Sequence, residues 1–235
     1  MRRRWRRAAG IGLVGCVCAA VPASAAVGAK PVPGWGTNGR VMAIAQIGGT
    51  TYLGGSFTQL VDPATGSTLA VTNLAALDSS GNPISSFRPV VNGAVKALAS
   101  DGTYLYAGGS FTSVDGSRRQ HLAKLDAAGA LLWLHARTNR EVDSLLVSGG
   151  VVYGGGTFTK ANAAIRNDAA AYAAAGSALL AWNPNAGGRV GAIVQTPAGI
   201  VVGGFFTKLG GSPAAHLGAT DPTSGAIRAW PGHPA

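Results

Sequence analysis

Residues that could carry acid–base or metal chemistry are sparse in this chain. Its 235 residues include 9 acidic side chains and 4 histidines, and Glu141 is the single glutamate. Glycoside hydrolysis needs two carboxylates that face each other across one bond, and the nearest partner of Glu141 along the chain is Asp143. Because these two follow Arg140 and lie two positions apart on a predicted strand, we interpret them as a solvated strand edge. The sequence therefore predicts no catalytic residue, no cofactor site and no metal site.

The histidines and the recurring aspartates have structural explanations. His121 and His216 occupy the same position of a repeat, at the start of a strand, so we expect blade-edge residues and not partners in one site. Asp78, Asp126 and Asp221 each precede a turn that contains glycine. An aspartate there accepts hydrogen bonds from backbone N–H groups two residues on. A calcium site would need more carboxylates than such a turn offers.

Basic residues suggest one kind of partner. Arg118, Arg119, Lys124, Arg137 and Arg140 lie within one short stretch, which is either an ordinary charged surface or a contact for an acidic polymer such as a wall glycan. The formal net charge is +10, but we find no clustered patch of the kind that binds nucleic acid.

Residues 1–26 have the pattern of an export signal. Five arginines within residues 2–7 precede an apolar run at 8–20, and Ala23 and Ala25 give the small-x-small pattern of a signal peptidase site. The apolar run is shorter than the ~20 residues that span a bilayer. We therefore expect cleavage after Ala25 or Ala26, a secreted protein and no stable membrane span.

Two alternatives remain for this segment. It could stay as an uncleaved anchor, or Leu13-Val14-Gly15-Cys16 could act as a lipobox that anchors the protein through an acylated Cys16. Cleavage after Ala26 would remove both cysteines of the chain and five of its 19 basic residues. We would then expect a net charge of about +5, no disulfide and no cysteine-ligated metal.

The body of the chain is a repeat. An 18-residue segment that starts with valine at 41, 95, 142 and 190 ends in GGSFT, GGSFT, GGTFT and GGFFT. Each copy is followed by a looser block, LAALD in the first unit, and by an aromatic residue. These aromatic residues are Phe87, Trp133, Trp182 and Trp230, with Trp35 as an extra copy upstream.

Each unit is predicted to form four short strands. In the first unit they cover 41–46, 51–58, 73–78 and 83–87, separated by glycine-containing turns. Four strands in ~45 to 50 residues are typical of a β-propeller blade. We therefore predict an all-β protein, a β-propeller of four-stranded blades with four repeats and a ring that these repeats leave incomplete or unusually small. The predicted parts are a signal peptide at 1–26, a linker with an orphan outer strand at 27–40, and repeat units at 41–94, 95–141, 142–189 and 190–235.

The paired glycines are predicted to be spacers. Alternation along the strand puts one glycine of each pair on each face, and such glycines mark a bulge or a close backbone approach. We expect both to make room where neighbouring blades pack, with the following phenylalanine filling the space between blades. The structural positions are Gly54, Gly55, Phe57, Gly108, Gly109, Phe111, Gly155, Gly156, Phe158, Gly203, Gly204 and Phe206.

The GG-[STF]-F-T copies, followed by LAALD or LAKLD and an aromatic residue near a proline, resemble the delta-60 repeat. This is a family of bacterial β-propeller-like repeats found largely in exported or surface proteins, and it includes domains of unknown function. The resemblance covers 41–230, although the spacings of 47 and 48 residues are short and the third unit lacks the LxxLD block. It implies a propeller and provides no catalytic residues to transfer.

Two functions fit this sequence. One is a secreted, non-catalytic module that binds an extracellular protein or polysaccharide through loops on a rigid ring. The other is an extracellular lyase or hydrolase at the channel mouth, using Asp62, Asp115 and an arginine or histidine from successive blades. Two carboxylates, or a histidine and a carboxylate, within hydrogen-bond reach of each other in one funnel would favour the enzyme.

Closure of the ring has three possible solutions. The repeats could form a small four-bladed ring, an open arc that pairs with a second copy, or part of a longer protein with further blades. We expect the last, because Trp230-Pro231 resembles Trp182-Asn183-Pro184, which leads into another unit. Exposed strand edges promote association, so we expect the 235-residue chain to be poorly monomeric.

Overall fold

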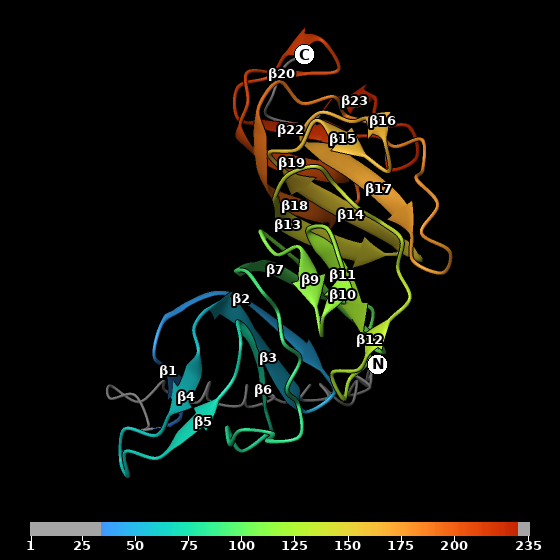
Figure 1. The fold of residues 1–235 in the computed structure, drawn as a ribbon. Coiled ribbons are helices and arrows are strands. Elements are labelled where there is room, and N and C mark those ends of the chain that lie inside the picture. The colour runs from blue at the N-terminus through green and yellow to red at the C-terminus, as the bar shows by residue number, and fades with distance from the viewer. Residues whose placement is uncertain (1–33, 230–235) are drawn as a thin grey trace, which may run out of the picture. The chain divides into compact units, whose positions relative to one another are not determined.

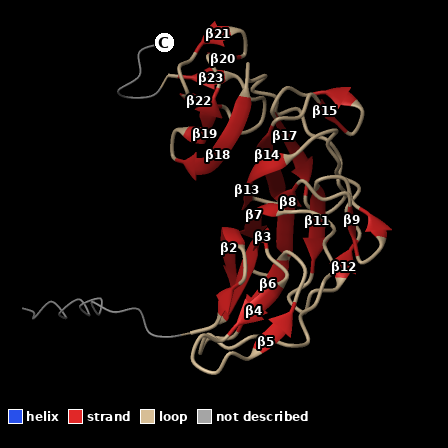
Figure 2. Ribbon diagram, turned by 60° about the vertical axis from the view of Figure 1, so that its left-hand side comes forward, coloured by secondary structure: helices blue, strands red, loops and turns tan. Residues whose placement is uncertain are grey.

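Residues 34–229 are described by a computed structural model, and they form strands, turns and loops without a helix (Figures 1 and 2). The expectation of an all-β protein is therefore confirmed for these residues. The predicted signal peptide, the first half of the predicted linker, and Trp230 lie outside them. Within residues 34–229 there is no helix that could cross a membrane.

Four principal antiparallel sheets follow one another along the chain. In each, the strands lie side by side in the order in which they occur in the sequence. The first sheet contains β2 (Arg40–Ile47), β3 (Thr50–Ser56) and β6 (Leu74–Leu77); the second β7 (Val95–Ser100), β8 (Leu105–Gly109), β11 (Leu122–Leu125) and β12 (Leu131–Leu132); the third β13 (Val142–Ser148), β14 (Val151–Gly156) and β17 (Ala169–Ala173); the fourth β18 (Arg189–Thr196), β19 (Gly199–Phe205), β22 (Leu217–Thr220) and β23 (Ile227–Arg228).

The predicted outer strand is shorter than expected. It is two residues long in the second and fourth sheets, as β12 and β23. In the first and third sheets it is reduced to single bridges, between Leu77 and Pro83 and between Tyr172 and Leu179. Four-stranded sheets are therefore present in two of the four units.

A small hairpin that the sequence analysis missed lies between the second and third strand of each unit. In three units two residues with positive φ connect its strands, for example Asp115 (φ 48°) and Gly116 (φ 71°). Positive φ at both central residues is the requirement of a type I′ turn. These hairpins are β4 (Gln59–Val61) with β5 (Thr68–Ala70), β9 (Ser113–Val114) with β10 (Ser117–Arg118), β15 (Lys160–Ala161) with β16 (Ala164–Ile165), and β20 (Lys208–Leu209) with β21 (Ser212–Pro213).

The predicted orphan outer strand belongs to the first of these hairpins. β1 (Gly36–Thr37) pairs with β4 and not with the outer side of a principal sheet. The equivalent residue before the next unit, Val91, forms a bridge with Val114 of β9. The segment before each inner strand is therefore a connector that crosses the hairpin, which corrects the prediction.

Three hydrophobic cores lie between consecutive sheets. The first joins residues of the first two sheets, among them Tyr52, Leu74, Leu105 and Phe111. The other two lie between the second and third sheets and between the third and fourth. The innermost strands β2, β7, β13 and β18 each contact the next in this order, and the first and fourth sheets lie at opposite ends of the series (Figures 1 and 2).

Candidate functional site

In the first three predicted pairs, the first glycine faces the inner strand of the following sheet. A β-carbon on Gly54 would lie 2.6 Å from Cγ1 of Val95, closer than side-chain carbons approach in proteins. The same contact recurs between Gly108 and Val142 at 2.7 Å and between Gly155 and Val190 at 2.5 Å. In the fourth sheet, the nearest atoms to a β-carbon on Gly203 lie 3.7 Å away and belong to its own sheet.

The second glycine serves a different purpose from the predicted one. A β-carbon on Gly55 would lie 2.0 Å from the carbonyl oxygen of Arg40, on the neighbouring strand of the same sheet. This contact occurs at a β-bulge, where the register between β2 and β3 shifts from Val41 to Ala43. Gly109, Gly156 and Gly204 meet the carbonyls of Ala94, Glu141 and Arg189 in the same way, at 2.0, 2.0 and 2.1 Å. These glycines therefore accommodate a bulge within a sheet and do not separate sheets.

The two histidines occupy a repeat position at which the backbone has a positive φ. His121 and His216 have φ angles of 66° and 67°, and Asn73 and Asp168, at the same repeat position, both have 63°. In each unit the N–H of this residue donates to the carbonyl of the repeat phenylalanine, and its carbonyl accepts from the second glycine. The phenylalanines themselves are at most 3% exposed. These two hydrogen bonds fix the backbone at the start of the third strand to the end of the second strand. They do not bring the two histidines together.

A repeated asparagine was missed in the sequence. In the first three units an asparagine lies three residues before the first valine; these are Asn38, Asn92 and Asn139. The side-chain oxygen of Asn92 accepts N–H bonds from Thr112 and Ser113 at 2.8 and 2.9 Å, and its amide donates to the Thr112 hydroxyl. Asn38 and Asn139 make the same three bonds. The last residue of the G-G-x-F-T motif is thus held by an asparagine 20 residues earlier in the chain.

The recurring aspartates hold turns, as predicted. Asp78 accepts N–H bonds from Ser80 and Asn82, and Asp126 accepts them from Ala128 and Ala130. These bonds hold the pKa of the Asp78 carboxyl below its ordinary value.

The aspartates named for a possible enzyme do not meet. Asp62 accepts bonds from Ala64 and Thr65 in its own hairpin, and Asp115 accepts the N–H of Val90. No three His, Cys, Asp or Glu side chains in residues 34–229 are grouped as a metal site.

Two other carboxylates do converge, on the inner strands. Lys96 of β7 donates to Glu141 and, at 3.1 Å, to Asp143 of β13, and Arg189 of β18 donates to Asp143 at 2.8 Å. The Asp143 side chain is 2% exposed. Burial lowers the pKa of Lys96, but its hydrogen bonds to the two carboxylates outweigh this effect, so that the pKa is raised. Asp143 is therefore buried between two cations from neighbouring sheets and is not at the solvated edge that was predicted, whereas Glu141, whose side chain is 41% exposed, stays partly solvated beside Lys96.

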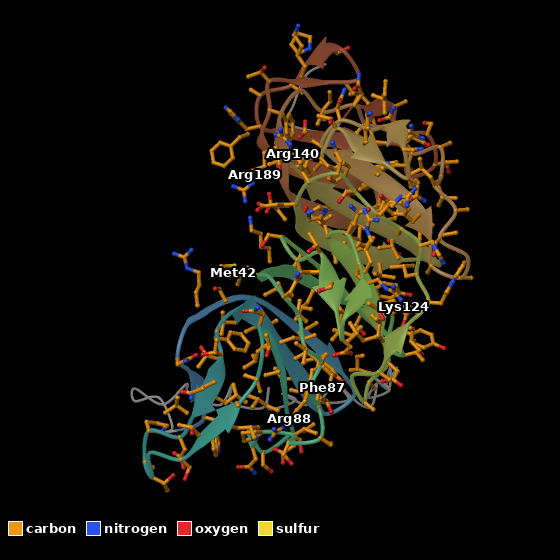
Figure 3. All side chains as sticks on the ribbon, viewed as in Figure 1. Met42, Phe87, Arg88, Lys124, Arg140 and Arg189 are labelled. Atoms are coloured by element: carbon orange, nitrogen blue, oxygen red, sulfur yellow. The ribbon has the colours of Figure 1, made fainter. Side chains whose placement is uncertain are left out.

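A basic hollow lies among the loops of the second unit. It has a volume of about 240 Å³ and is lined by Arg118, Arg119, Gln120, Leu134, His135, Ala136 and Arg137. A second hollow of about 150 Å³ shares Gln120 and Arg137 with it and extends to Lys160 and Asn162 of the next unit. Three of the five basic residues named from the sequence meet here, while Lys124 instead lies over the ring of Tyr104 at 3.9 Å. Lys124 is on the opposite side of the sheets from Arg189 and Met42 in the view of Figure 3.

The charges of the hollow are uncompensated within the described residues. Neither hollow has a carboxylate in its lining, and none of the ion pairs in residues 34–229 involves Arg118, Arg137 or Lys160. Arg119 is held differently, because its guanidinium donates to the carbonyls of Arg118 and Leu132. The two hollows together therefore offer an anion the exposed groups of Arg118, Arg137 and Lys160.

Trp133 adds an exposed aromatic ring beside this hollow. It is 64% exposed, and its ring lies 4.2 Å from that of His135. Phe87 and Trp182 stand eight residues before the next inner-strand valine, but Trp133 stands nine before it. Leu134 therefore takes the buried place, at 3% exposure, and Trp133 is displaced to the surface. This one-residue offset is the signal that could have identified Trp133 in the sequence.

Comparisons with known proteins provide no family. No protein-family model and no curated protein matches the chain. Among solved structures, the computationally designed Ika4 protein is similar with a TM-score of 0.43 and 18% identity, covering 72% of this chain and 87% of its own. The designed Ika8 protein has a TM-score of 0.36, 14% identity and coverages of 80% and 85%. A chain of the Mitotic Checkpoint Complex has a TM-score of 0.45 and 16% identity, and the match covers 77% of this chain and 68% of that one. These values are too low to support an argument about function.

Proposed function

We propose that the protein is a non-catalytic module that binds an anionic polysaccharide outside the cell. The observation that carries this proposal is the hollow lined by Arg118 and Arg137, with Lys160 next to it, no carboxylate in its lining, and the exposed ring of Trp133 beside it.

The chemistry of these groups favours a chain of acidic sugars. Arginine binds carboxylates and sulfates through two parallel hydrogen bonds, and an exposed aromatic ring offers an apolar face against which a sugar ring packs. Because the two hollows share Gln120 and Arg137, a linear polymer can contact Arg118 and Lys160 at the same time. A small anion would occupy one of these places.

We also propose that each of the four sheets is a blade of a β-propeller. The meander order of the strands and the packing of each sheet on the next support it, as does the resemblance to the delta-60 repeat. A location outside the cell is supported by the pattern of residues 1–26, with secretion and a lipid anchor at Cys16 as the two routes.

Titration calorimetry with polygalacturonate at low salt tests the binding proposal. We expect the double variant Arg118→Gln, Arg137→Gln to lose about tenfold or more in affinity, because hydrogen bonds to charged groups are each worth ~1.5 to 3 kcal/mol. Trp133→Ala should weaken binding about threefold, and added salt should weaken the wild type.

Controls decide whether the effect is local. Arg88→Gln removes an exposed arginine of the first unit, whose Nε donates to the carbonyl of Ser85, and should leave affinity unchanged. A neutral galactan should not bind. Equal binding of duplex DNA, an equal loss in Arg88→Gln, or no binding of polygalacturonate would contradict the proposal.

An extracellular hydrolase or lyase is the second candidate, favoured by the convergence of Glu141 and Asp143 on Lys96. Both carboxylates are engaged in ion pairs with cations, and the Asp143 side chain is 2% exposed, so its access to a substrate is blocked. The same polygalacturonate samples distinguish the two functions, since an enzyme would release new chain ends and a binding module would not.

A further inference from the structure

The contact between consecutive sheets has two complementary halves. Between the second and third sheets, Gly108 and Leu122 form one half, and Val142 and Leu145 form the other. A β-carbon on Gly108 would lie 2.7 Å from Val142 and 3.2 Å from Leu145. Leu122 and Val142 are each 1% exposed, so this contact excludes water.

The first sheet carries the valine half of such a contact without a partner in the described part of the chain. Val41 and Ile44 occupy the repeat positions of Val142 and Leu145. They are 37% and 62% exposed. This end of the series therefore presents two exposed apolar side chains. Their counterparts in the second sheet are buried, since Val95 is 0% and Leu98 is 9% exposed.

The fourth sheet carries the glycine half. Gly203 and Leu217 occupy the positions of Gly108 and Leu122. The three nearest atoms to a β-carbon built on Gly203 lie 3.7 to 3.8 Å away and all belong to its own unit, and Leu217 is 37% exposed. Val194 and Phe205 of the same sheet are 53% and 74% exposed, and large exposed apolar side chains that lie together mark interaction sites.

We propose that these two faces bind each other between two copies of this chain, with the Gly203 face of one copy receiving Val41 and Ile44 of the next. The occupant is a second copy because each half has its complement at the other end of the same chain, in the pattern that already joins three pairs of sheets. Such a contact is heterologous, so it leads either to a closed ring of copies or to an open chain of them. It does not depend on the polysaccharide proposal, because Arg118 and Trp133 lie on other elements.

Sedimentation velocity and light scattering on the full-length protein test this contact. At about 50 μM, which would occupy a contact with a Kd of about 1 μM, we expect a mass of two or more copies. Ile44→Glu and Leu217→Glu should each shift the protein to monomer by weakening association about tenfold or more, since each buries a charge in an apolar contact. Ile165→Glu, which changes an isoleucine that is 71% exposed on the β16 hairpin, should leave the mass unchanged.

Mixing the two variants identifies the geometry. Ile44→Glu retains an intact Gly203 face, and Leu217→Glu retains an intact Val41 face, so an equimolar mixture should form a dimer that neither forms alone. Circular dichroism and thermal unfolding of each variant should match the wild type, because both residues are exposed in the single copy.

Three results would overturn the proposal. A monomeric wild type at this concentration would show that the two faces do not bind each other and that other parts of the chain, or solvent, cover them. Dissociation by one variant but not the other would show a symmetric contact of like faces. A mixture that stays monomeric while both variants are folded would exclude head-to-tail pairing.

Discussion

The asparagine that binds the G-G-x-F-T threonine explains why this threonine recurs in the first three units. Asn38, Asn92 and Asn139 each accept two N–H bonds from the threonine and the residue after it. The fourth unit has Gly187 at this place, and its N–H still donates to the carbonyl of Lys208. The backbone geometry is therefore retained there, although the side chain that makes the three bonds is missing.

We predict that Gly187→Asn stabilises the protein. Gly187 does not have a positive φ, and the nearest atom to a β-carbon built on it lies 3.4 Å away, in the Lys208 side chain. The new amide should bond Thr207 and Lys208 as Asn92 bonds Thr112 and Ser113, and raise the free energy of unfolding by about 1 kcal/mol.

Urea unfolding monitored by tryptophan fluorescence measures this change. Gly187→Ala is the matched control, because it also removes the flexibility of glycine but adds no hydrogen-bonding group. An asparagine variant no more stable than the alanine variant would show that the amide does not reach Thr207.

Neighbouring sheets are held together by shape as well as by apolar area. In the first three pairs the first glycine lets a valine of the next inner strand approach the backbone, and in all four pairs the second makes room for a bulge within its own sheet. Charged groups add a second connection, since Asp143 of the third sheet binds Lys96 of the second and Arg189 of the fourth.

We predict that Gly108→Ala destabilises the protein by about 1 to 3 kcal/mol, the usual cost of overpacking a core. Its β-carbon would lie 2.7 Å from Val142, whose side chain is buried and cannot move away. Gly154→Ala is the control on the adjacent sheet, because the nearest atom to its β-carbon lies 3.7 Å away. Thermal unfolding of the two variants should differ in this direction, and equal melting temperatures would show that the glycine is not required for sheet packing.

Buried tyrosines connect the series of sheets from end to end. The hydroxyl of Tyr52 in the first sheet donates to the carbonyl of Ala127 in the second unit, and that of Tyr153 in the third sheet donates to the carbonyl of Pro222 in the fourth unit. Desolvation by burial raises the pKa of Tyr52, Tyr106, Tyr153 and Tyr172 above the ordinary value of 10.0.

These pKa shifts predict that the folded part of the chain, residues 34–229, loses stability at alkaline pH. Since the folded state holds these phenol protons more tightly than the unfolded state, their contribution to stability is complete below pH 10 and is lost as the pH rises above it. Urea unfolding at increasing pH, together with tyrosinate absorbance, measures this loss. Tyr153→Phe keeps the ring that packs on Trp182 at 5.1 Å and should make the decline with pH less steep. A decline of unchanged steepness in this variant would contradict the assignment to Tyr153.

Local signals in the sequence determined the strands, because alternation and turn residues act over a few positions. The four repeats, the strand pairs that contain the double glycine, and the turns closed by Asp78 and Asp126 could be predicted for this reason. The Asp-Gly pair at 115–116 was a local signal too, and it identifies a hairpin that was overlooked. The sequence also indicated the basic character of the second unit.

The tertiary structure alone decided which residues meet across larger distances. It separated the roles of Gly54 and Gly55, which depend on a neighbouring sheet and a neighbouring strand. It also joined Arg118 and Arg137 to Lys160 in adjoining hollows, exposed Trp133 while burying Leu134, and brought Asp143 between two cations. These outcomes follow from the stacking of sheets, which sets the environment of a residue by contacts about one repeat length away that no local pattern contains.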